Sequence, residues 1–313
     1  MTDHTAQGVP VSIVVPVYRS EAILPHLVTK VREAMAGSGL RYELILVNDV
    51  SPDGSWEAIK RLAAEHDFVR GICLSKNVGQ HNATMAGLGQ VRGEVVIVMD
   101  DDLQHPPQAI VDLVKSIRSG HDVCYTRYAH RQHAAWKKVG SWFNDRVATV
   151  LLDKPAGLYL SSFKAMHRRV ADEVVKYDGP YAYVDGLILD VTRNIDVLTI
   201  EHQARFAGEG NYNLRRSLSL WLKMATSFSI VPLRIATVLG LSITALSLIV
   251  GIVIIVRKLS HPELLASGWA SLIATVLFVG GIQTFCLGLL GEYLGRAYLK
   301  INKKPQFVIR ERT

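Results

Sequence analysis

Hydrophobic and polar positions follow two different periods over the first 130 residues. Short β-branched runs predict buried strands, and the stretches between them carry apolar residues three or four positions apart, as helices do. The predicted strands are Val11–Val15, Tyr42–Val47, Val69–Leu74, Glu94–Met99 and Asp122–Thr126. The predicted helices are residues 21–36, 51–64, 83–91 and 106–119. This alternation predicts an α/β fold, with a doubly wound parallel sheet covered on both faces.

The pattern is looser after residue 135. We expect helices at residues 136–152 and 170–176, a late strand at 195–201 and a Gly-rich loop at 207–213. Residues 214–230 are amphipathic, with basic side chains set against leucines and Trp221. Such a helix beside a membrane segment lies in the lipid interface, although an ordinary core-facing helix has a similar pattern.

Two segments, residues 235–256 and 269–290, carry no charged side chain. Each has about 22 residues, roughly 33 Å as a helix, which is enough to cross a ~30 Å hydrocarbon core. We therefore predict a transmembrane hairpin. Lysines and arginines are concentrated before and after it, so the positive-inside rule places both ends in the cytosol. Glycines in the second segment predict close packing, within the hairpin or between subunits of a homo-oligomer: Gly280, Gly281, Gly288 and Gly291.

The predicted organisation has four parts. Residues 1–213 form a cytosolic catalytic domain, 214–232 the interfacial helix, 233–295 the hairpin and 296–313 a basic cytosolic tail. The polar N-terminus lacks the apolar core of a signal peptide. The expected location is therefore the inner (plasma) membrane, as an integral protein.

The formal net charge of +7 fits an anionic lipid or substrate. Nucleic acid is not an expected partner, because no basic run is interleaved with aromatic residues. The three cysteines are isolated in sequence, which indicates neither a zinc site nor a disulfide framework: Cys73, Cys124 and Cys286.

Three consecutive carboxylates follow the fourth predicted strand, at Asp100, Asp101 and Asp102. Ligands of such sheets bind beyond the carboxyl ends of the strands. Asp100 and Asp102 are two positions apart, so in an extended segment they point the same way. Together with the Gln104 amide they suit Mg²⁺ or Mn²⁺, with diphosphate oxygens completing the shell. The alternative is a solvated acidic loop that caps the next helix.

Two more acids lie at the ends of earlier predicted strands. Asp49 follows the second strand and is a candidate hydrogen-bond acceptor for a nucleobase or ribose. Glu21 follows the first strand and has two interpretations, a similar ligand role and helix capping.

Several motifs together resemble one family. They are Pro16-Val-Tyr-x-x-Glu21, Asp49, Lys76-Asn-x-Gly79, Asp100-x-Asp-Leu-Gln-x-Pro-Pro107, Arg205-Phe-x-Gly-x-x-x-Tyr212 and Gly288-x-x-Gly-Glu-Tyr-Leu-Gly-Arg296. The chain resembles family-2 glycosyltransferases of the GT-A fold, which has a mostly parallel sheet. Within them it is similar to polyprenyl-phosphate glycosyltransferases: dolichol-phosphate mannose synthases and bactoprenol glucosyltransferases.

The resemblance implies roles for individual residues. The nucleotide-sugar donor would be bound by Pro16, Tyr18, Glu21, Asp49, Asp100 and Asp101. The metal would be held by Asp100, Asp102 and Gln104. Arg127 and Arg205 match basic residues near the donor phosphates, although each has an alternative as a surface arginine.

The sequence departs from the family at Ser162, where an aspartate often stands. A base is dispensable here, because a phosphate acceptor with a second pKa near 6 is largely ionised at neutral pH. Lys164 is a candidate ligand of the acceptor phosphate.

The expected activity is inverting transfer of a hexosyl group, from a UDP-linked donor, to polyprenyl (undecaprenyl) phosphate at the cytosolic membrane face, for modification of cell-envelope glycans. Two alternatives are open: a processive polysaccharide synthase of the same fold, and an inactive membrane scaffold. The chain lacks the Gln-x-x-Arg-Trp motif that processive synthases usually carry.

Overall fold

A computed structural model describes residues 10–128, 149, 154–155, 157–179, 182–200, 231–260, 268–302 and 305–313. The Gly-rich loop at 207–213, the amphipathic segment 214–230 and nearly all of the helix predicted at 136–152 lie outside them. The chain divides into two compact units. The first comprises residues 1–213 and 303–313, and the second residues 214–302.

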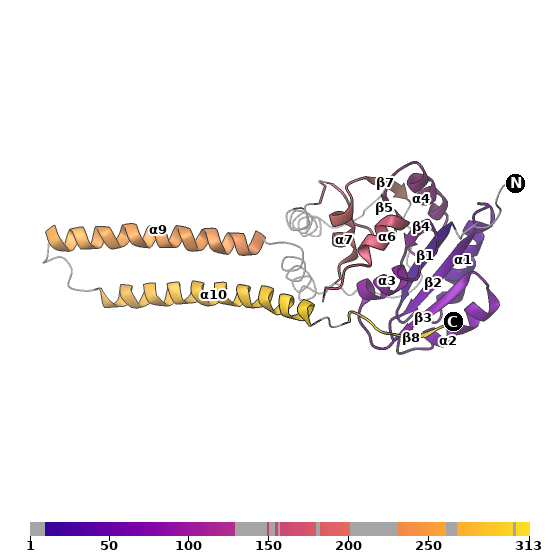
Figure 1. The fold of residues 1–313 in the computed structure, drawn as a ribbon, viewed down its shortest axis with the longest axis horizontal. Coiled ribbons are helices and arrows are strands. Elements are labelled where there is room, and N and C mark those ends of the chain that lie inside the picture. The colour runs from indigo at the N-terminus through magenta and orange to yellow at the C-terminus, as the bar shows by residue number, and fades with distance from the viewer. Residues whose placement is uncertain are drawn as a thin grey trace. The chain divides into compact units, whose positions relative to one another are not determined.

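The described part of the first unit contains an eight-stranded sheet in the order β7-β5-β6-β4-β1-β2-β3-β8 (Figure 1). The strands are β1 Val11–Val17, β2 Tyr42–Asn48, β3 Val69–Leu74, β4 Val95–Val98, β5 Val123–Tyr128, β6 Lys164–His167, β7 Ile195–Ile200 and β8 Ile309–Arg312. β1 to β4 are parallel to one another, as the β-branched runs predict. The α/β prediction with a mostly parallel sheet is confirmed.

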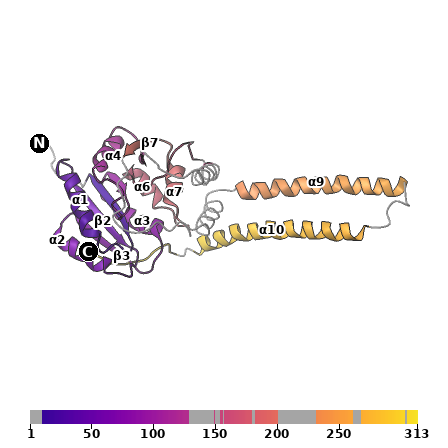
Figure 2. The same cartoon turned by 180° about the vertical axis from the view of Figure 1, so that it is seen from behind.

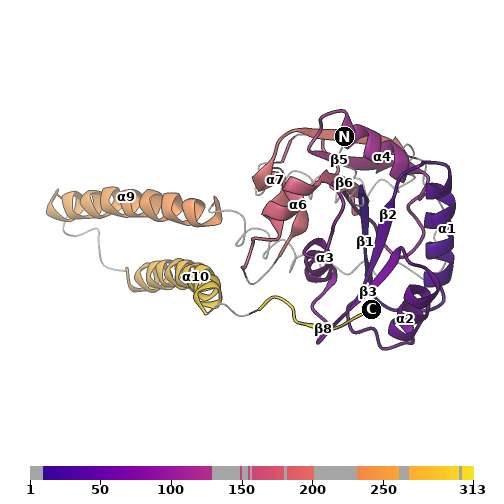
Figure 3. The same cartoon turned by 45° about the vertical axis from the view of Figure 1, so that its right-hand side comes forward.

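Helices cover both faces of the sheet. They are α1 Leu24–Ala36, α2 Ser55–Glu65, α3 Gln80–Leu88, α4 Ala109–Arg118, α6 Arg168–Val174 and α7 Val184–Val191. α1 and α2 lie together on one side of the sheet, beside β2 and β3 in Figure 2. α3 and α6 lie across the sheet from α1 and α2 in Figure 3. α7 was not predicted. Val184, Leu187, Ile188 and Val191 do have helical spacing, but the helix has only 8 residues, fewer than the roughly 11–18 over which such a period becomes distinctive.

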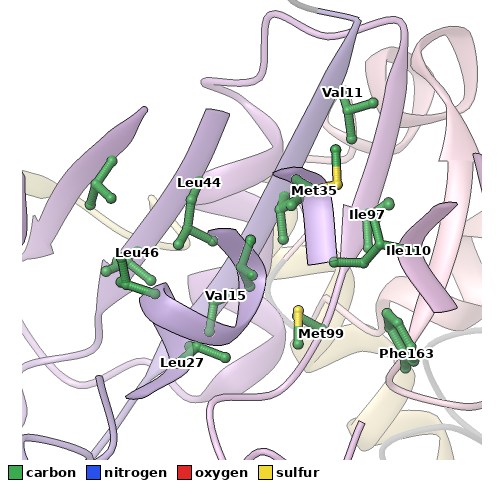
Figure 4. Packing of buried hydrophobic residues seen from close by; sticks show 14 of the residues in the cluster. Val11, Val15, Leu27, Met35, Leu44, Leu46, Ile97, Met99, Ile110 and Phe163 are labelled. Carbon is green, nitrogen blue, oxygen red and sulfur yellow. The ribbon is translucent and has the colours of Figure 1, made fainter. Parts of the chain in front are cut away.

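The main hydrophobic core lies between the sheet and the layer of α1, α2 and α4. Alternate residues of the central strands point into it, Val11 and Val15 of β1 with Leu44 and Leu46 of β2 (Figure 4). On the opposite face α3 packs closely. A Cβ at Gly87 would come within 2.4 Å of Val14 Cγ1, so this position of α3 needs glycine. Both faces of the sheet are therefore fixed by packing.

Two strands were not predicted from the hydrophobic pattern. β6 is antiparallel to both β4 and β5 and lies between them. Its sequence, KAMH, has no β-branched residue. β8 pairs antiparallel with β3 at the sheet edge, and its sequence, IRER, is mostly charged. Charged residues are usual on edge strands, where they discourage pairing with other chains.

The segment predicted as a basic tail, residues 296–313, includes two ordered elements. Its start completes helix α10 (Trp269–Ile301), and its end is β8. The indole nitrogen of Trp56 donates to Glu311 at 3.0 Å, and the Gly71 N–H donates to Thr313 Oγ1 at 2.7 Å. The C-terminal residues thus belong to the eight-stranded sheet of the first unit.

The second unit contains two long helices, α9 (Val231–Ser260) and α10, which run alongside each other. Among the residues that the structure describes, no helix is both long enough and apolar enough to cross a membrane. The predicted transmembrane hairpin is unconfirmed. Exposed large apolar side chains of the two helices include Ile235, Leu241, Ile249, Leu272, Phe285 and Leu294.

The glycines of α10 lie in open space. Apart from the adjacent backbone of α10 itself and each glycine's chain neighbours, no described atom lies within 4 Å of a Cβ built on Gly280, Gly281, Gly288 or Gly291. Within the described part of this chain they are not points of close helix packing. Association of subunits through these glycines remains a prediction.

Candidate active site

The loops that follow β1, β2 and β4 carry an unusual backbone. Arg19, Val50 and Leu103 have φ values of 60°, 53° and 58°, and within the described ranges they are the non-glycine residues with positive φ. Such a φ is uncommon for non-glycine residues and a genuine outlier for a β-branched one such as Val50. Strained backbone concentrates at functional sites. The carboxyl edge of the parallel strands is therefore the candidate site, as the acids predicted.

Asp100 is held by two other segments. Gln80 Nε2, at the start of α3, donates to Asp100 Oδ1 at 2.6 Å. Ser162 Oγ, shortly before β6, donates to Asp100 Oδ2 at 2.6 Å. His105 Nε2 lies 3.5 Å from the same Oδ2. Of these three partners the sequence singled out Ser162, as the departure from the family, but not as a partner of Asp100. Gln80 and His105 were missed, although Gln80 directly follows the Lys76-Asn-x-Gly79 motif.

Asp101 points toward the loop after β1. Its Oδ2 accepts hydrogen bonds from the Tyr18 N–H at 3.2 Å and from Ser20 Oγ at 2.5 Å. Burial raises the pKa of Asp101 to about 6, although these two hydrogen bonds oppose the shift. Asp101 therefore connects the loops after β1 and β4. Its predicted contact with the donor is untested.

Asp102 and Gln104 form the turn after Asp101. The Gln104 N–H donates to Asp102 Oδ1 at 3.1 Å, and the positive φ of Leu103 lies between them. Among the described residues, no group of three or more His, Cys, Asp or Glu side chains is arranged to hold a metal ion. Mg²⁺ is usually held by one or two carboxylates plus substrate phosphates and water. The hard oxygen donors of Asp100 and Asp102 fit such a cation when a diphosphate supplies the remaining ligands.

Asp49 organises the loop between β3 and α3. Its two carboxylate oxygens accept the backbone N–H groups of Val78 and Gly79, each at 2.8 Å. Asn77 Nδ2 donates to the Asp49 carbonyl at 2.9 Å, and Gly79 has a φ of 83°. Burial raises the pKa of Asp49, while the two N–H donors lower it. The motif Lys76-Asn-x-Gly79 thus has a structural explanation, since it supplies the donors that surround Asp49.

Glu21 caps α2 rather than its own helix. Its Oε2 accepts the N–H of Gly54, the N-cap residue of α2, at 2.9 Å. Tyr18 is 46% exposed, and the Arg19 guanidinium lies 5.4 Å from the centre of its ring. Pro16 is buried in β1. The capping interpretation of Glu21 agrees with its contact, and Tyr18 offers an exposed aromatic face.

Lys164 is buried away from solvent. Its ammonium group pairs with Asp185 of α7 and lies 5.3 Å from the centre of the Tyr125 ring. Tyr125 OH donates to the same Asp185 Oδ1 at 3.0 Å. Burial lowers the pKa of nearby His81. Contact of Lys164 with an acceptor phosphate would require this pair to open, so the contacts favour a structural role.

Of the two arginines predicted to lie near the donor phosphates, Arg127 is among the described residues. Arg127, in β5, is exposed, and its Nη2 donates to the Gly157 carbonyl at 2.8 Å. Arg205 lies outside the described residues. The structure therefore brings together the predicted acids and leaves a cationic side chain of β5 accessible.

Two family models match the chain. Glycosyl transferase family 2 matches residues 12–175, and the GtrB C-terminal hairpin matches residues 231–297. An undecaprenyl-phosphate 4-deoxy-4-formamido-L-arabinose transferase of Shewanella sediminis is 33% identical and covers 96% of this chain and 92% of its own. The protein of the same name from Klebsiella pneumoniae (strain 342) is 32% identical, with coverage of 96% and 92%.

Solved structures share the fold. Glucosyl-3-phosphoglycerate synthase from Mycobacterium tuberculosis, crystallised with Mn²⁺, UDP-glucose and phosphoglyceric acid, superposes with a TM-score of 0.52 at 17% identity. The superposition covers 69% of this chain and 77% of that one. The strand-end acids lie within the family match at residues 12–175, and the relatives extend over nearly the whole chain. The protein belongs to glycosyl transferase family 2 and is a glycosyltransferase.

Proposed function

We propose that the protein transfers a sugar from a nucleotide sugar to a polyprenyl phosphate such as undecaprenyl phosphate. The observation that carries this proposal is similarity over almost the full length to transferases named for undecaprenyl phosphate. The acceptor phosphate oxygen forms a bond to the anomeric carbon, and the bond from that carbon to the diphosphate oxygen breaks. A single displacement of this kind inverts the anomeric configuration.

The chain's own residues would bind the donor at the carboxyl edge of β1, β2 and β4. Asp100, Asp102 and Gln104 would hold Mg²⁺ or Mn²⁺, which when bound stabilises charge on the leaving nucleoside diphosphate. Tyr18, on the loop after β1, has an exposed ring that would contact the nucleoside. Asp49, at the end of β2, is buried and bonded to the N–H groups of Val78 and Gly79, so it would shape the donor site through that loop, and direct contact with a nucleoside would require these bonds to open. Arg127, exposed in β5, would compensate charge as two anions approach. We extend the same role to Arg205.

No side chain needs to act as a general base. The acceptor is already largely ionised near neutral pH, because the second pKa of a phosphate ester is near 6. Ser162 donates its hydroxyl to Asp100 and cannot accept a proton as a carboxylate would. We therefore propose that the protein acts by orienting the donor and the acceptor phosphate and by compensating their negative charge.

We propose that α9 and α10 hold the enzyme at the membrane, with the catalytic domain on the cytosolic side. Large apolar side chains are exposed along both helices, and extended exposed apolar surfaces mark membrane or protein interaction sites. The match of residues 231–297 to a hairpin family supports the same placement. An acceptor with a long apolar chain is reached most directly from that location.

The donor sugar is the finer part of the proposal. A UDP-linked hexose is the expectation from sequence, whereas the relatives are named for a 4-deoxy-4-formamido-L-arabinose. A panel of nucleotide sugars that includes both classes, incubated with undecaprenyl phosphate and read by mass spectrometry, tests acceptor and donor together. A glycosylated lipid phosphate with at least one donor is expected.

Two variants test the metal assignment. Asp102→Asn is expected to lose at least tenfold in the metal-dependent rate. Asp112→Asn is the matched control, because Asp112 is an exposed carboxylate of α4 paired with Lys115. Product formation by Asp102→Asn at the control rate would overturn the metal assignment, and absence of lipid product with every donor would overturn the acceptor assignment.

A further inference from the structure

Asp100 is oriented by two neutral donors, one on each carboxylate oxygen. Gln80 Nε2 donates to Oδ1 and Ser162 Oγ to Oδ2, both at 2.6 Å. We propose that Gln80 and Ser162 are positioning residues, which set the direction in which Asp100 presents its free lone pairs to the cation. This inference rests on the proposed function of Asp100 as a metal ligand.

The two hydrogen bonds leave Asp100 able to coordinate. An ionised carboxylate has about four acceptor positions, and two donors occupy two of them. His105 Nε2 lies 3.5 Å from Oδ2, beyond the usual hydrogen-bond range, so each oxygen keeps a lone pair. Rotation of the carboxylate about its Cβ–Cγ bond would break both contacts. Partners that orient a metal ligand typically change metal affinity by about 10–100-fold when they are removed.

The backbone at each donor is anchored by the fold. Gln80 begins α3, directly after Gly79, whose N–H is bound by Asp49. Ser162 follows Ser161, whose hydroxyl oxygen accepts hydrogen bonds from Thr126 Oγ1 and the Phe163 N–H. It also shortly precedes β6, which pairs with β4. The Ser162 side chain is half-buried and the Gln80 side chain is exposed, so Ser162 is the more firmly held of the two donors.

The chemical type of the donors suits the acidic surroundings. Asp100 is adjacent to Asp101 and Asp102, and their combined negative charge attracts a divalent cation. A lysine or arginine at position 80 or 162 would offset that charge and compete with the cation. An amide and a hydroxyl fix the geometry without adding charge, so they orient Asp100 and leave the electrostatic attraction intact.

Direct Mn²⁺ binding to the full-length protein tests the inference. Electron paramagnetic resonance, which detects free Mn²⁺, gives the Kd in the presence of UDP. Ser162→Ala and Gln80→Ala are each expected to raise this Kd by about 10–100-fold. Ser162→Thr, which keeps the hydroxyl, is expected to stay within about threefold of the parent. Ser119→Ala is the matched control, because Ser119 is an exposed serine of α4's C-terminus bonded to backbone.

A second readout separates positioning from general loss of structure. The rate of glycolipid formation by Ser162→Ala should recover toward the parental value as Mn²⁺ is raised, with an unchanged donor KM at saturating metal. Parental Mn²⁺ affinity in both alanine variants, or a rate that added Mn²⁺ fails to restore, would overturn the inference. Asp100→Ala separates the two proposals. If Asp100→Ala binds Mn²⁺ like the parent, the metal assignment itself fails. If Asp100→Ala loses Mn²⁺ binding while Ser162→Ala and Gln80→Ala keep parental affinity, the positioning inference alone fails.

Discussion

Replacing Lys164 by methionine would test whether this lysine supports the fold or binds substrate. The side chains of Lys164 and Asp185 are 4% and 9% exposed and form an ion pair. Tyr125 OH donates to the same carboxylate at 3.0 Å. Methionine has a similar length and no charge, so Lys164→Met leaves Asp185 with the tyrosine hydroxyl and without its cation.

The expected loss is large because the remaining charge stays buried. Removing one partner of a buried ion pair costs about 3–5 kcal/mol of unfolding free energy. We expect a value near 3 kcal/mol, because the hydrogen bond from Tyr125 remains and protonation of Asp185 relieves part of the cost. At about 2–4 °C per kcal/mol for a domain of this size, the midpoint falls by about 6–12 °C. The double variant Lys164→Met with Asp185→Leu should recover part of this loss, since apolar replacements of buried pairs are often neutral. Recovery is incomplete because the buried Tyr125 hydroxyl loses its acceptor, at a cost of about 1–3 kcal/mol.

The assay is denaturation of the full-length protein followed by tryptophan fluorescence, with each single variant and the double variant compared with the parent. Lys115→Met is the matched control, because Lys115 forms an exposed ion pair with Asp112 and such pairs contribute about 0–1 kcal/mol. A loss below about 1 kcal/mol for Lys164→Met, together with loss of transfer activity, would refute the reasoning. Lys164 would then be a ligand of the acceptor phosphate, as its sequence position suggests.

Three further outcomes follow from close contacts and from the C-terminal strand. Gly54→Ala places a Cβ 2.4 Å from Glu21 Oε1, so Glu21 must move and its hydrogen bond to the Gly54 N–H is lost; calorimetry should show a loss of about 0.5–2 kcal/mol, as for other lost N-terminal caps. Gly93→Ala places a Cβ 2.6 Å from the backbone nitrogen of Ser12, so calorimetry should show a loss of about 1–3 kcal/mol. In the intact chain the Gly71 amide donates to Thr313. Deletion of residues 309–313 removes this acceptor and the strand beside β3, so hydrogen exchange of the Gly71 amide should accelerate by at least tenfold.

The parallel half of the fold could be predicted because its signal is local. Each of β1 to β4 is a run of apolar residues, and each is followed by a helix with its own period. β6 and β8 could not be predicted in this way, because KAMH and IRER contain too little β-branched or alternating sequence. Their positions depend on pairing with strands distant in the chain, which no local window contains.

In the candidate site, too, local sequence features could be predicted and contacts between distant segments could not. Asp100, Asp101 and Asp102 are consecutive and follow a strand, so their chemistry was visible in the sequence. The partners of these acids come from far along the chain, and Ser162 is 62 positions from Asp100. For Glu21 the sequence left capping and ligand roles open, and the structure shows a cap on α2, a helix other than its own.

The antiparallel direction of β6 explains why Ser162 and Lys164 have such different surroundings. Lys164 is paired with Val98 of β4, so the chain before β6 emerges at the same edge as the chain after β4. Ser162 therefore meets Asp100, whereas Lys164 lies inside the sheet and points toward α7 and Asp185. A shift of one residue in this pairing would move Lys164 to the opposite face, which is filled by the α1, α2 and α4 core. The register of a four-residue strand thus decides which side chain reaches the acids and which one stays buried.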